Sequence, residues 1–295
     1  MLDRTLIEPL NEQLDAERLC TIGNGDTGRA VKCRDKDGSF FVLKCYSKII
    51  SGAFDLARNI KEAAALSKLH HFNVVRYLDS FVHENYLYVK IEYCSGLNLR
   101  SIIDKYLENE TYPPESDIKS FLSQIVGALH HIHAQGIIHY DIKPDNIFTV
   151  DFNLCTDNNN SSPNLPQMIY KIGDFGQCFI PGLLNIEVCE GDSRYIGRET
   201  LEFIDEHLSV DRESSFFPSP FSDIFALGLT TAEYCICGDL PSFGVEWHTI
   251  RNGNLPMISD QYSPALIDLL TAMIRNEPTN RPSAETILNC PYLNS

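Results

Sequence analysis

Ten residues, HYDIKPDNIF at 139–148, constrain the fold of this chain more than any other part of its sequence. They bring a carboxylate, an ammonium group and a carboxamide into one short stretch, at Asp141, Lys143 and Asn146. Further along, YKIGDFG at 170–176 places Asp174 directly after a predicted strand. Carboxylate and carboxamide oxygens are ligands that Mg²⁺ accepts, and a lysine neutralises phosphate charge. The two stretches, in this order, predict a site for a magnesium-bound phosphate group.

Each of these residue types suits one task in phosphoryl transfer. Asp141 can accept the proton of an incoming hydroxyl, and Lys143 can neutralise charge on the transferring group. Asn146 and Asp174 can hold the metal ion from two sides. Such a transfer depends mostly on positioning and charge neutralisation, so these are the side chains that it requires.

A glycine pattern near the start of the chain predicts a lid over phosphates. Gly23, Gly25 and Gly28 form G-x-G-x-x-G between two predicted strands. The same spacing marks dinucleotide-binding folds, but there a helix begins at the glycines. Here a strand follows, as in a hairpin that covers nucleotide phosphates, and glycine permits the close backbone approach.

Lys44 and Glu62 are candidates for an ion pair beside this lid. Lys44 ends the predicted strand FFVLK, and Glu62 lies on the predicted helix at 55–69. A lysine can hold the α- and β-phosphates if a carboxylate fixes its ammonium group. Taken singly, each residue would be interpreted as an exposed surface side chain.

The pattern of apolar residues changes from strands to helices part-way along the chain. Up to Tyr93, alternating and β-branched segments predict strands around one helix. The strands are expected at 18–23, 28–34, 39–46, 74–82 and 86–94, and later helices at 116–136, 223–238 and 263–276. This order predicts an α+β fold with a small β-rich lobe, residues 1–93, and a larger helical lobe, residues 94–295. Two polar stretches, near 151–168 and 209–220, are expected to be surface insertions, with Phe216 and Phe217 as loop anchors or, alternatively, a docking element.

Composition excludes several classes of protein. The 295 residues are 43% hydrophobic, so a full core can form. A formal charge of −16 argues against nucleic-acid binding and favours a protein partner. There is neither a leader peptide nor an apolar run that could span a membrane, so a soluble intracellular protein is expected. The ten cysteines are scattered and are predicted to be free thiols, and the spacing of His130, His131 and His133 does not fit a metal site.

Across nearly its whole length the chain resembles the eukaryotic protein kinases. The resemblance implies a bilobal kinase fold that uses ATP and Mg²⁺, with Asp141 as catalytic base, assisted by Lys143. It implies Lys44 and Glu62 as an ion pair, and Asn146 and Asp174 as magnesium ligands. The implied nucleotide site consists of Ile22, Gly23, Asn24, Gly25, Gly28, Ala30, Val42, Lys44, Ile91, Glu92, Cys94 and Phe148.

The resemblance also implies supporting contacts outside the nucleotide site. Glu199, at the end of EGDSRYIGRE, would pair with Arg281 of NRPSA. Asp223 would bind the backbone of the catalytic loop, with Phe225 in the position of a common aromatic residue. The hinge would run through Glu92, Tyr93 and Cys94, with Ile91 behind it as the gatekeeper.

Among kinases, the chain is most similar to the Wee family. The shared segments are EYC, DIKPDNIF, YKIGDFG, EGDSRYIGRETL, DIFALGL, EWHTIRNGNLP and NRPSA. This likeness implies a monomeric enzyme of the nucleus or cytoplasm. It would phosphorylate a tyrosine of a cyclin-dependent kinase bound to its cyclin, and so restrain mitotic entry. A general serine/threonine kinase and an inactive, kinase-shaped binding module remain alternatives.

Several positions depart from the usual kinase pattern. Asp192 replaces a threonine common in serine/threonine kinases, and an ion pair with Lys143 is expected. Tyr140 replaces the arginine that binds a phosphorylated activation loop, so activity without that phosphorylation is predicted. Ala30 and Val42 exchange the usual valine and alanine, and we expect the two changes to compensate in volume. Thr27 in the lid and the GRE sequence at 197–199 are further departures.

Overall fold

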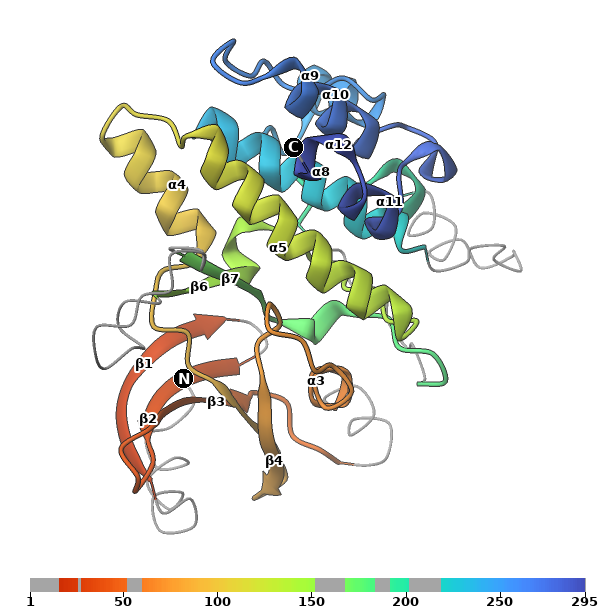
Figure 1. Ribbon diagram of the computed structural model, residues 1–295. Helices are drawn as coiled ribbons and strands as arrows, with labels where there is room; N and C mark the ends of the chain where they lie inside the picture. Colours follow the sequence, from red (N-terminus) through yellow and green to blue (C-terminus); the bar gives the residue numbers. More distant parts are fainter. Residues whose placement is uncertain are drawn as a thin grey trace.

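The computed structural model describes residues 16–25, 28–51, 60–151, 168–183, 192–201 and 219–294. Figure 1 shows a curved sheet with one flanking helix on one side, and a group of helices on the other. The sheet ends at Glu92, and the first helix of the second part begins at Leu99. This arrangement confirms the predicted α+β, two-part architecture.

The sheet consists of five antiparallel strands in the order β1-β2-β3-β5-β4. All five correspond to strands predicted from alternation. They are β1 Glu17–Gly25, β2 Gly28–Arg34, β3 Phe40–Tyr46, β4 Tyr77–His83 and β5 Tyr86–Glu92. In the register of β2 and β3, Ala30 lies opposite Lys44, and Lys32 lies opposite Val42. Residues directly opposite each other share a face, so Ala30, Val42 and Lys44 point to the same side of the sheet.

One helix, α3 Lys61–Leu66, packs beside the sheet. Ala65 and Leu66 are buried in the main core, and Glu62 is buried with them at 1% exposure. The predicted helix spanned 55–69, and its first five positions lie outside the described residues. Since a buried carboxylate requires a partner, the burial of Glu62 already points to a cation nearby.

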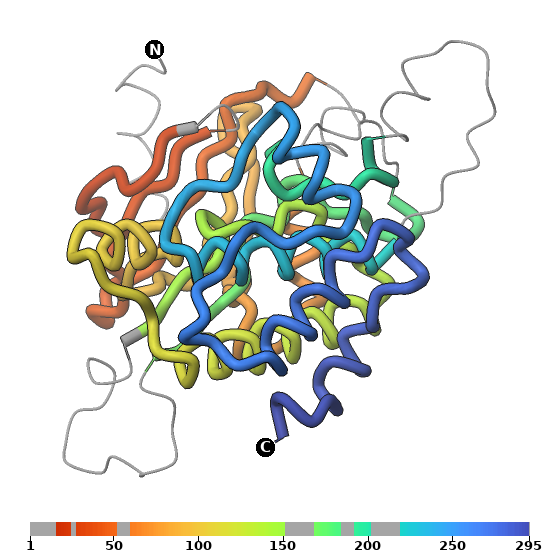
Figure 2. The backbone as a smooth tube through the Cα atoms, turned by 90° about the horizontal axis from the view of Figure 1, so that it is seen from above, coloured from red at the N-terminus to blue at the C-terminus, as the bar shows by residue number. Residues whose placement is uncertain are grey.

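The second part is built around α5 Glu115–Ala134 and α8 Phe221–Ile236. Both were predicted from their apolar periodicity, and α8 is buried on all sides. The other helices are α4 Leu99–Glu108, α9 Gly244–Arg251, α10 Pro264–Met273, α11 Ala284–Leu288 and α12 Pro291–Asn294. Side chains of Asn98, Ser263 and Ser283 accept backbone N–H groups at the starts of α4, α10 and α11. Seen from above in Figure 2, the C-terminal helices lie beside α5, in agreement with the contact between α5 and α11.

A short hairpin, β6 Ile147–Asp151 and β7 Met168–Ile172, lies between the sheet and the helices (Figure 1). Val74 forms an isolated parallel bridge to Ile172, which links this hairpin to the first part. The hairpin carries the ends of both chemical motifs, because Asn146 precedes β6 and Asp174 follows β7. Most of the two expected insertions lies outside the described residues, including Phe216 and Phe217.

Two findings concern the cysteines and the helices of the described residues. The eight cysteines described there are all free. No helix described is both long and apolar enough to cross a bilayer.

Candidate active site

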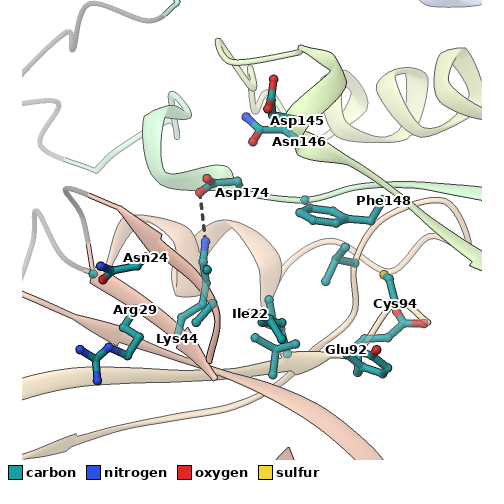
Figure 3. Close-up of a pocket in the computed structure, with 18 of the residues that line it drawn as sticks. Ile22, Asn24, Arg29, Lys44, Glu92, Cys94, Asp145, Asn146, Phe148 and Asp174 are labelled. Carbon is teal, nitrogen blue, oxygen red and sulfur yellow. Dashed lines mark hydrogen bonds and ion pairs between the residues drawn. The ribbon is translucent and has the colours of Figure 1, made fainter. Parts of the chain in front are cut away.

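A cleft of about 670 Å³ lies between the sheet and the helical part (Figure 3). Its volume is that of an ordinary small-molecule site. Of the residues predicted to bind the nucleotide, the cleft is lined by Ile22, Gly23, Asn24, Gly28, Ala30, Val42, Lys44, Ile91, Glu92, Cys94 and Phe148. Gly25 ends β1 and pairs with Gly28. A Cβ at Gly28 would lie 2.1 Å from the Cys45 carbonyl oxygen, so this position requires glycine.

Lys44 is held between two carboxylates. Its Nζ lies 2.7 and 2.9 Å from the Glu62 carboxylate oxygens and 3.0 Å from Asp174 Oδ1. The Tyr46 hydroxyl also donates to the Glu62 carboxylate. Burial alone would lower the pKa of Lys44, but the two carboxylates raise it above its ordinary value, so the side chain stays a cation. The expected pairing with Glu62 is present, and Glu62 itself lies behind the cleft rather than lining it.

Asp141 is fixed by both of its predicted neighbours. Its Oδ1 accepts from Lys143 Nζ at 2.9 Å, and its Oδ2 accepts from Asn146 Nδ2 at 2.7 Å. Burial raises the pKa of Asp141 above its ordinary value, although Lys143 and the Asn146 hydrogen bond oppose this. The carboxylate is therefore a stronger base than an exposed aspartate, which suits a proton acceptor.

Asp223 binds the backbone of the catalytic loop, the segment that leads to Asp141. This fully buried carboxylate accepts the N–H groups of His139 at 2.9 Å and Tyr140 at 2.8 Å, and it contacts His133 Nε2 at 2.9 Å. Tyr140 has a φ of 60°, a conformation that is strained for a side chain of this size. Such strain persists only where surrounding contacts determine the backbone, and Asp223 supplies them. The predicted contact of Asp223 with this loop is present.

Asp174 follows β7 and lines the cleft. The Gly173 N–H donates to the backbone carbonyl oxygen of Asn146 at 3.0 Å, which links the two motifs. Burial would raise the pKa of Asp174, but Lys44 outweighs this and lowers it, so the carboxylate stays ionised. The Phe175 ring packs in the core against His139, with ring centroids 4.6 Å apart.

The donor set fits a magnesium ion that arrives with phosphates. The side-chain Nδ2 of Asn146 donates to Asp141, so its side-chain Oδ1 remains available to bind a cation. Asp174 offers one ionised carboxylate. The described residues contain no cluster of three or more histidine, cysteine or acidic side chains suited to a metal. Magnesium commonly takes only one or two protein ligands and completes its shell with substrate phosphates and water.

Comparison with known proteins identifies the architecture. The family model described as "Protein kinase domain" matches residues 16–293. The chain belongs to the protein kinase family. It is 34% identical over 272 residues to Wee1-like protein kinase 2 of Xenopus tropicalis, covering 90% of this chain and 46% of that protein. It is 33% identical over 290 residues to the Gallus gallus protein of that name, covering 96% and 48%, and 35% identical over 301 residues to that of Sus scrofa, covering 96% and 50%. The chain thus spans about half the length of these relatives.

In this kinase domain the predicted pair of Glu199 and Arg281 is present. The two guanidinium nitrogens lie 2.6 and 2.9 Å from the carboxylate oxygens of Glu199. Such a two-point contact is strong and directional. The guanidinium also lies 4.7 Å from the centre of the Phe225 ring. The pair fixes the end of the 192–201 segment to the helical lobe.

The expected ion pair between Asp192 and Lys143 is wrong. Asp192 instead accepts from Arg194, at 3.0 Å from Nε and 2.7 Å from Nη2. Lys143 is already bound to Asp141. An arginine two residues away offers a fork that matches a carboxylate, which a single ammonium group cannot do. Both Asp192 and Arg194 line the cleft.

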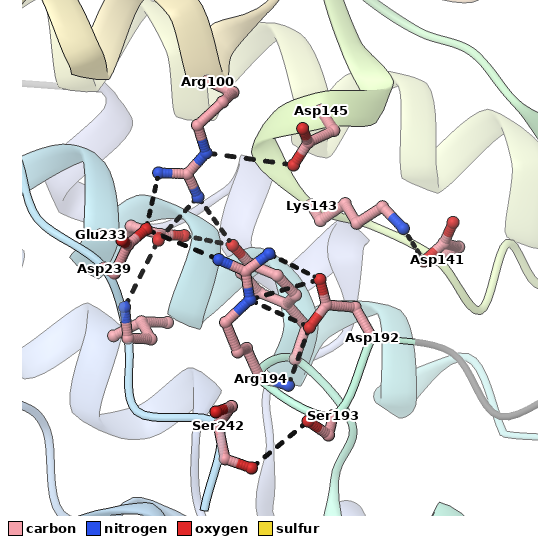
Figure 4. A network of polar contacts seen from close by, with 12 residues as sticks. Arg100, Asp141, Lys143, Asp145, Asp192, Ser193, Arg194, Glu233, Asp239 and Ser242 are labelled. Atoms are coloured by element: carbon pink, nitrogen blue, oxygen red, sulfur yellow. Dashed lines mark hydrogen bonds and ion pairs between the residues drawn. The ribbon is translucent and has the colours of Figure 1, made fainter. Parts of the chain in front are cut away.

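A network that sequence reasoning missed extends from this pair into the helical lobe (Figure 4). Arg100 of α4 donates to the buried Glu233 of α8 at 2.7 Å and to the Tyr195 hydroxyl at 3.1 Å. The Tyr195 hydroxyl in turn donates to Glu233. Asp239 lies 3.3 Å from Arg100 and 3.5 Å from Arg194. The partners Arg100 and Glu233 are 133 positions apart, so no local pattern in the sequence could show them.

Tyr46 was also missed, although the sequence carries a signal for it. It follows Lys44 by two positions on β3, and a strand repeats its face every two residues. Its contact with Glu62 could therefore have been expected. Two members of the histidine cluster contact other side chains: His133 binds Asp223, and His131 stacks on His71.

Proposed function

We propose that this domain is an ATP-dependent kinase that phosphorylates a tyrosine of a cyclin-dependent kinase bound to its cyclin. The observation that supports the chemistry best is the geometry of Asp141. Its carboxylate is shielded from water, oriented by Lys143 and Asn146, and joined through Asn146 to the β7 end that carries Asp174. A carboxylate in this setting can accept a hydroxyl proton beside bound phosphates.

In the proposed reaction, the acceptor oxygen attacks the γ-phosphorus of ATP. The new oxygen–phosphorus bond forms as the bond from the γ-phosphorus to the bridging oxygen of ADP breaks, and Asp141 takes the acceptor proton. Lys44 orients the α- and β-phosphates and is itself held by Glu62. Lys143 lies beside Asp141, where it can neutralise charge on the transferring group. Magnesium, when bound at Asn146 and Asp174, supplies further charge neutralisation.

The choice of tyrosine rests on likeness to the Wee family. The relatives named above are Wee1-like protein kinases. Within the shared segment EGDSRY, Asp192 and Tyr195 line a small pocket together with Asp141, so this segment borders the place where an acceptor would lie. A monomeric state, and residence in the nucleus or cytoplasm, follow from the same likeness and stay predictions.

The decisive experiment supplies Mg-ATP and a kinase-dead cyclin-dependent kinase bound to its cyclin, then maps the modified residue. Phosphotyrosine is expected with the wild-type protein and none with Asp141→Asn. Asp104→Asn, the same change on the exposed side of α4, is the matched control and should retain activity. Phosphoserine or phosphothreonine would favour a general serine/threonine kinase. Equal signals from wild type and Asp141→Asn would favour an inactive binding module.

A further inference from the structure

Two apolar side chains at the start of α9 are almost fully exposed. Phe243 and Val245 are each 83% exposed, and among the large apolar side chains of the described residues only Met257 exceeds them. Gly244 separates them with a φ of 87° and has open space around it. This turn directs two large apolar groups outward. An apolar surface of this kind commonly marks a site of protein association.

Residues on both sides of this pair in the sequence contact the segment that borders the cleft. Ser193 donates through its hydroxyl to the Ser242 carbonyl oxygen at 3.3 Å, as Figure 4 shows. Trp247 Nε1 donates to the Ser193 carbonyl oxygen at 2.9 Å. Phe243 and Val245 therefore sit between two positions that both bind Ser193. The neighbours of Ser193 on either side, Asp192 and Arg194, line the cleft.

Arg251 makes α9 and this segment a single unit. Its side chain is buried and donates to the carbonyl oxygens of Ser193, Arg194 and Trp247. It also lies 4.1 Å from the centre of the Trp247 ring. These contacts fix α9 relative to Ser193 and Arg194, in the segment that borders the cleft. A protein that binds the outer surface of α9 is thereby oriented toward the cleft.

The charges around the two apolar side chains indicate the chemistry of the partner. Glu246, the residue after Val245 on α9, is exposed. The chain as a whole carries a formal charge of −16. Two exposed apolar side chains next to an exposed carboxylate, on an acidic chain, complement an apolar side chain flanked by lysine or arginine.

We propose that Phe243 and Val245 form a docking surface for the folded protein substrate, which binds through an apolar residue flanked by basic ones. This inference rests on the proposed function for the identity of the occupant. The surface lies outside the catalytic machinery, so it contributes to recognition of the protein and not to transfer of the phosphoryl group. A short peptide that carries only the acceptor tyrosine does not reach it.

The first test compares a protein substrate with a short peptide. Phe243→Ser/Val245→Ser is expected to lower kcat/KM for the cyclin-dependent kinase–cyclin complex by about tenfold, mainly through KM. Its kcat/KM for the peptide should be unchanged, which also shows that the variant is folded. Leu107→Ser, at an apolar side chain 58% exposed on α4, is the matched control and should change neither. An unchanged value for the protein, or an equal loss for both substrates, overturns the proposal.

The second test measures binding and does not depend on catalysis. Asp141→Asn is immobilised, and its affinity for the same complex is measured with and without the two serine substitutions. A weaker affinity with the substitutions supports docking even if the wild type proves inactive, whereas equal affinities overturn it. Glu246→Lys should weaken binding as well, because it places a cation against the basic residues of the partner. Added salt should then weaken binding less when Glu246 is replaced than when it is present.

Discussion

Two influences of opposite sign act on the pKa of Asp141, the proposed proton acceptor. Burial raises its pKa, whereas Lys143 at 2.9 Å lowers it. A base acts only when deprotonated, so activity should fall as the pH falls through this pKa. The position of the acid limb of the pH profile therefore reports the balance between burial and Lys143.

Removal of Lys143 should move this limb in a defined direction. In Lys143→Ala the influence that lowers the pKa of Asp141 is lost, so the pKa rises and the acid limb of kcat/KM shifts to higher pH. The measurement is a profile of kcat/KM from about pH 5 to 9, in which the limb position is independent of the absolute rate. Lys105→Ala, at an exposed lysine of α4, should leave the limb in place. A limb that stays or moves to lower pH in Lys143→Ala contradicts this account.

Ala30 and Val42 both line the cleft from the same face of the sheet, on strands β2 and β3. Ala30 stands where valine is usual, and Val42 stands where alanine is usual. The combined volume of the two side chains is thus conserved, and we predict that each change compensates for the other. Val42→Ala alone should remove apolar contact with the nucleotide and raise KM for ATP by roughly tenfold. The double variant Ala30→Val/Val42→Ala should return KM toward the wild-type value. Markedly tighter ATP binding by Val42→Ala would show that the two positions do not compensate.

At the scale of elements, the long strands and helices could be predicted, but the short helices could not. β1 to β5, α5, α8 and α10 carry a clear period of apolar residues. Helices as short as α11 and α12 are not stable alone and depend on packing against the rest of the lobe. α4 did offer a signal, since Asn98 caps it by accepting the Ser101 N–H at 3.0 Å. Cross-element contacts such as Arg100 with Glu233 depend on the tertiary fold alone.

The Arg100–Glu233 contact should be a strong contributor to stability. Arg100→Met leaves the carboxylate of Glu233 buried without its cation, which should cost about 3 kcal/mol. The measurement is chemical or thermal unfolding. Asp239→Asn removes a partner that is 78% exposed and should cost less than about 1 kcal/mol. The prediction holds only if Arg100→Met lowers the free energy of unfolding clearly more than Asp239→Asn does.

Side-chain contacts hold the 192–201 segment in place. Between Asp174 and Asp192 the sequence contains no serine, threonine or tyrosine. The next hydroxyls, those of Ser193 and Tyr195, are bonded to Ser242 and Glu233. Tyr140, which replaces the usual arginine, accepts the Ser219 N–H at 3.2 Å through its hydroxyl.

Activity without phosphorylation of this segment is therefore expected. Protein treated with a phosphatase should keep its full kcat on the cyclin-dependent kinase complex, with the absence of phosphate verified by mass spectrometry. The comparison sample is untreated protein, which keeps any phosphate that it carries. Loss of turnover after treatment, together with recovery on addition of an upstream kinase, would refute the prediction.

At the scale of the whole molecule, the site joins parts that are distant in sequence. Lys44 and Glu62 come from the sheet and α3, whereas Asp141 and Asn146 come from the helical part. Each motif carries its own local structure, so the contact of Lys44 with Glu62 could be predicted from the order of the motifs. The partner of Asp192 was mistaken, because the choice between Lys143 and Arg194 depends on how two loops lie in space.

A ligand that contacts both parts should stabilise the molecule as a whole. The cleft is lined from the sheet by Val42 and Lys44 and from the helical side by Phe148 and Asp174. Mg-ATP at about one hundred times its Kd should add about 2.7 kcal/mol to the free energy of unfolding, and so raise Tm by roughly 5 °C or more. Removal of Mg²⁺ with a chelator should reduce the shift, since Asn146 and Asp174 then lose the ion that links them to the phosphates. Lys44→Met should reduce it as well, whereas Lys105→Met, on the exposed side of α4, should not. A wild-type Tm that does not respond to Mg-ATP at millimolar concentration would contradict nucleotide binding in this cleft.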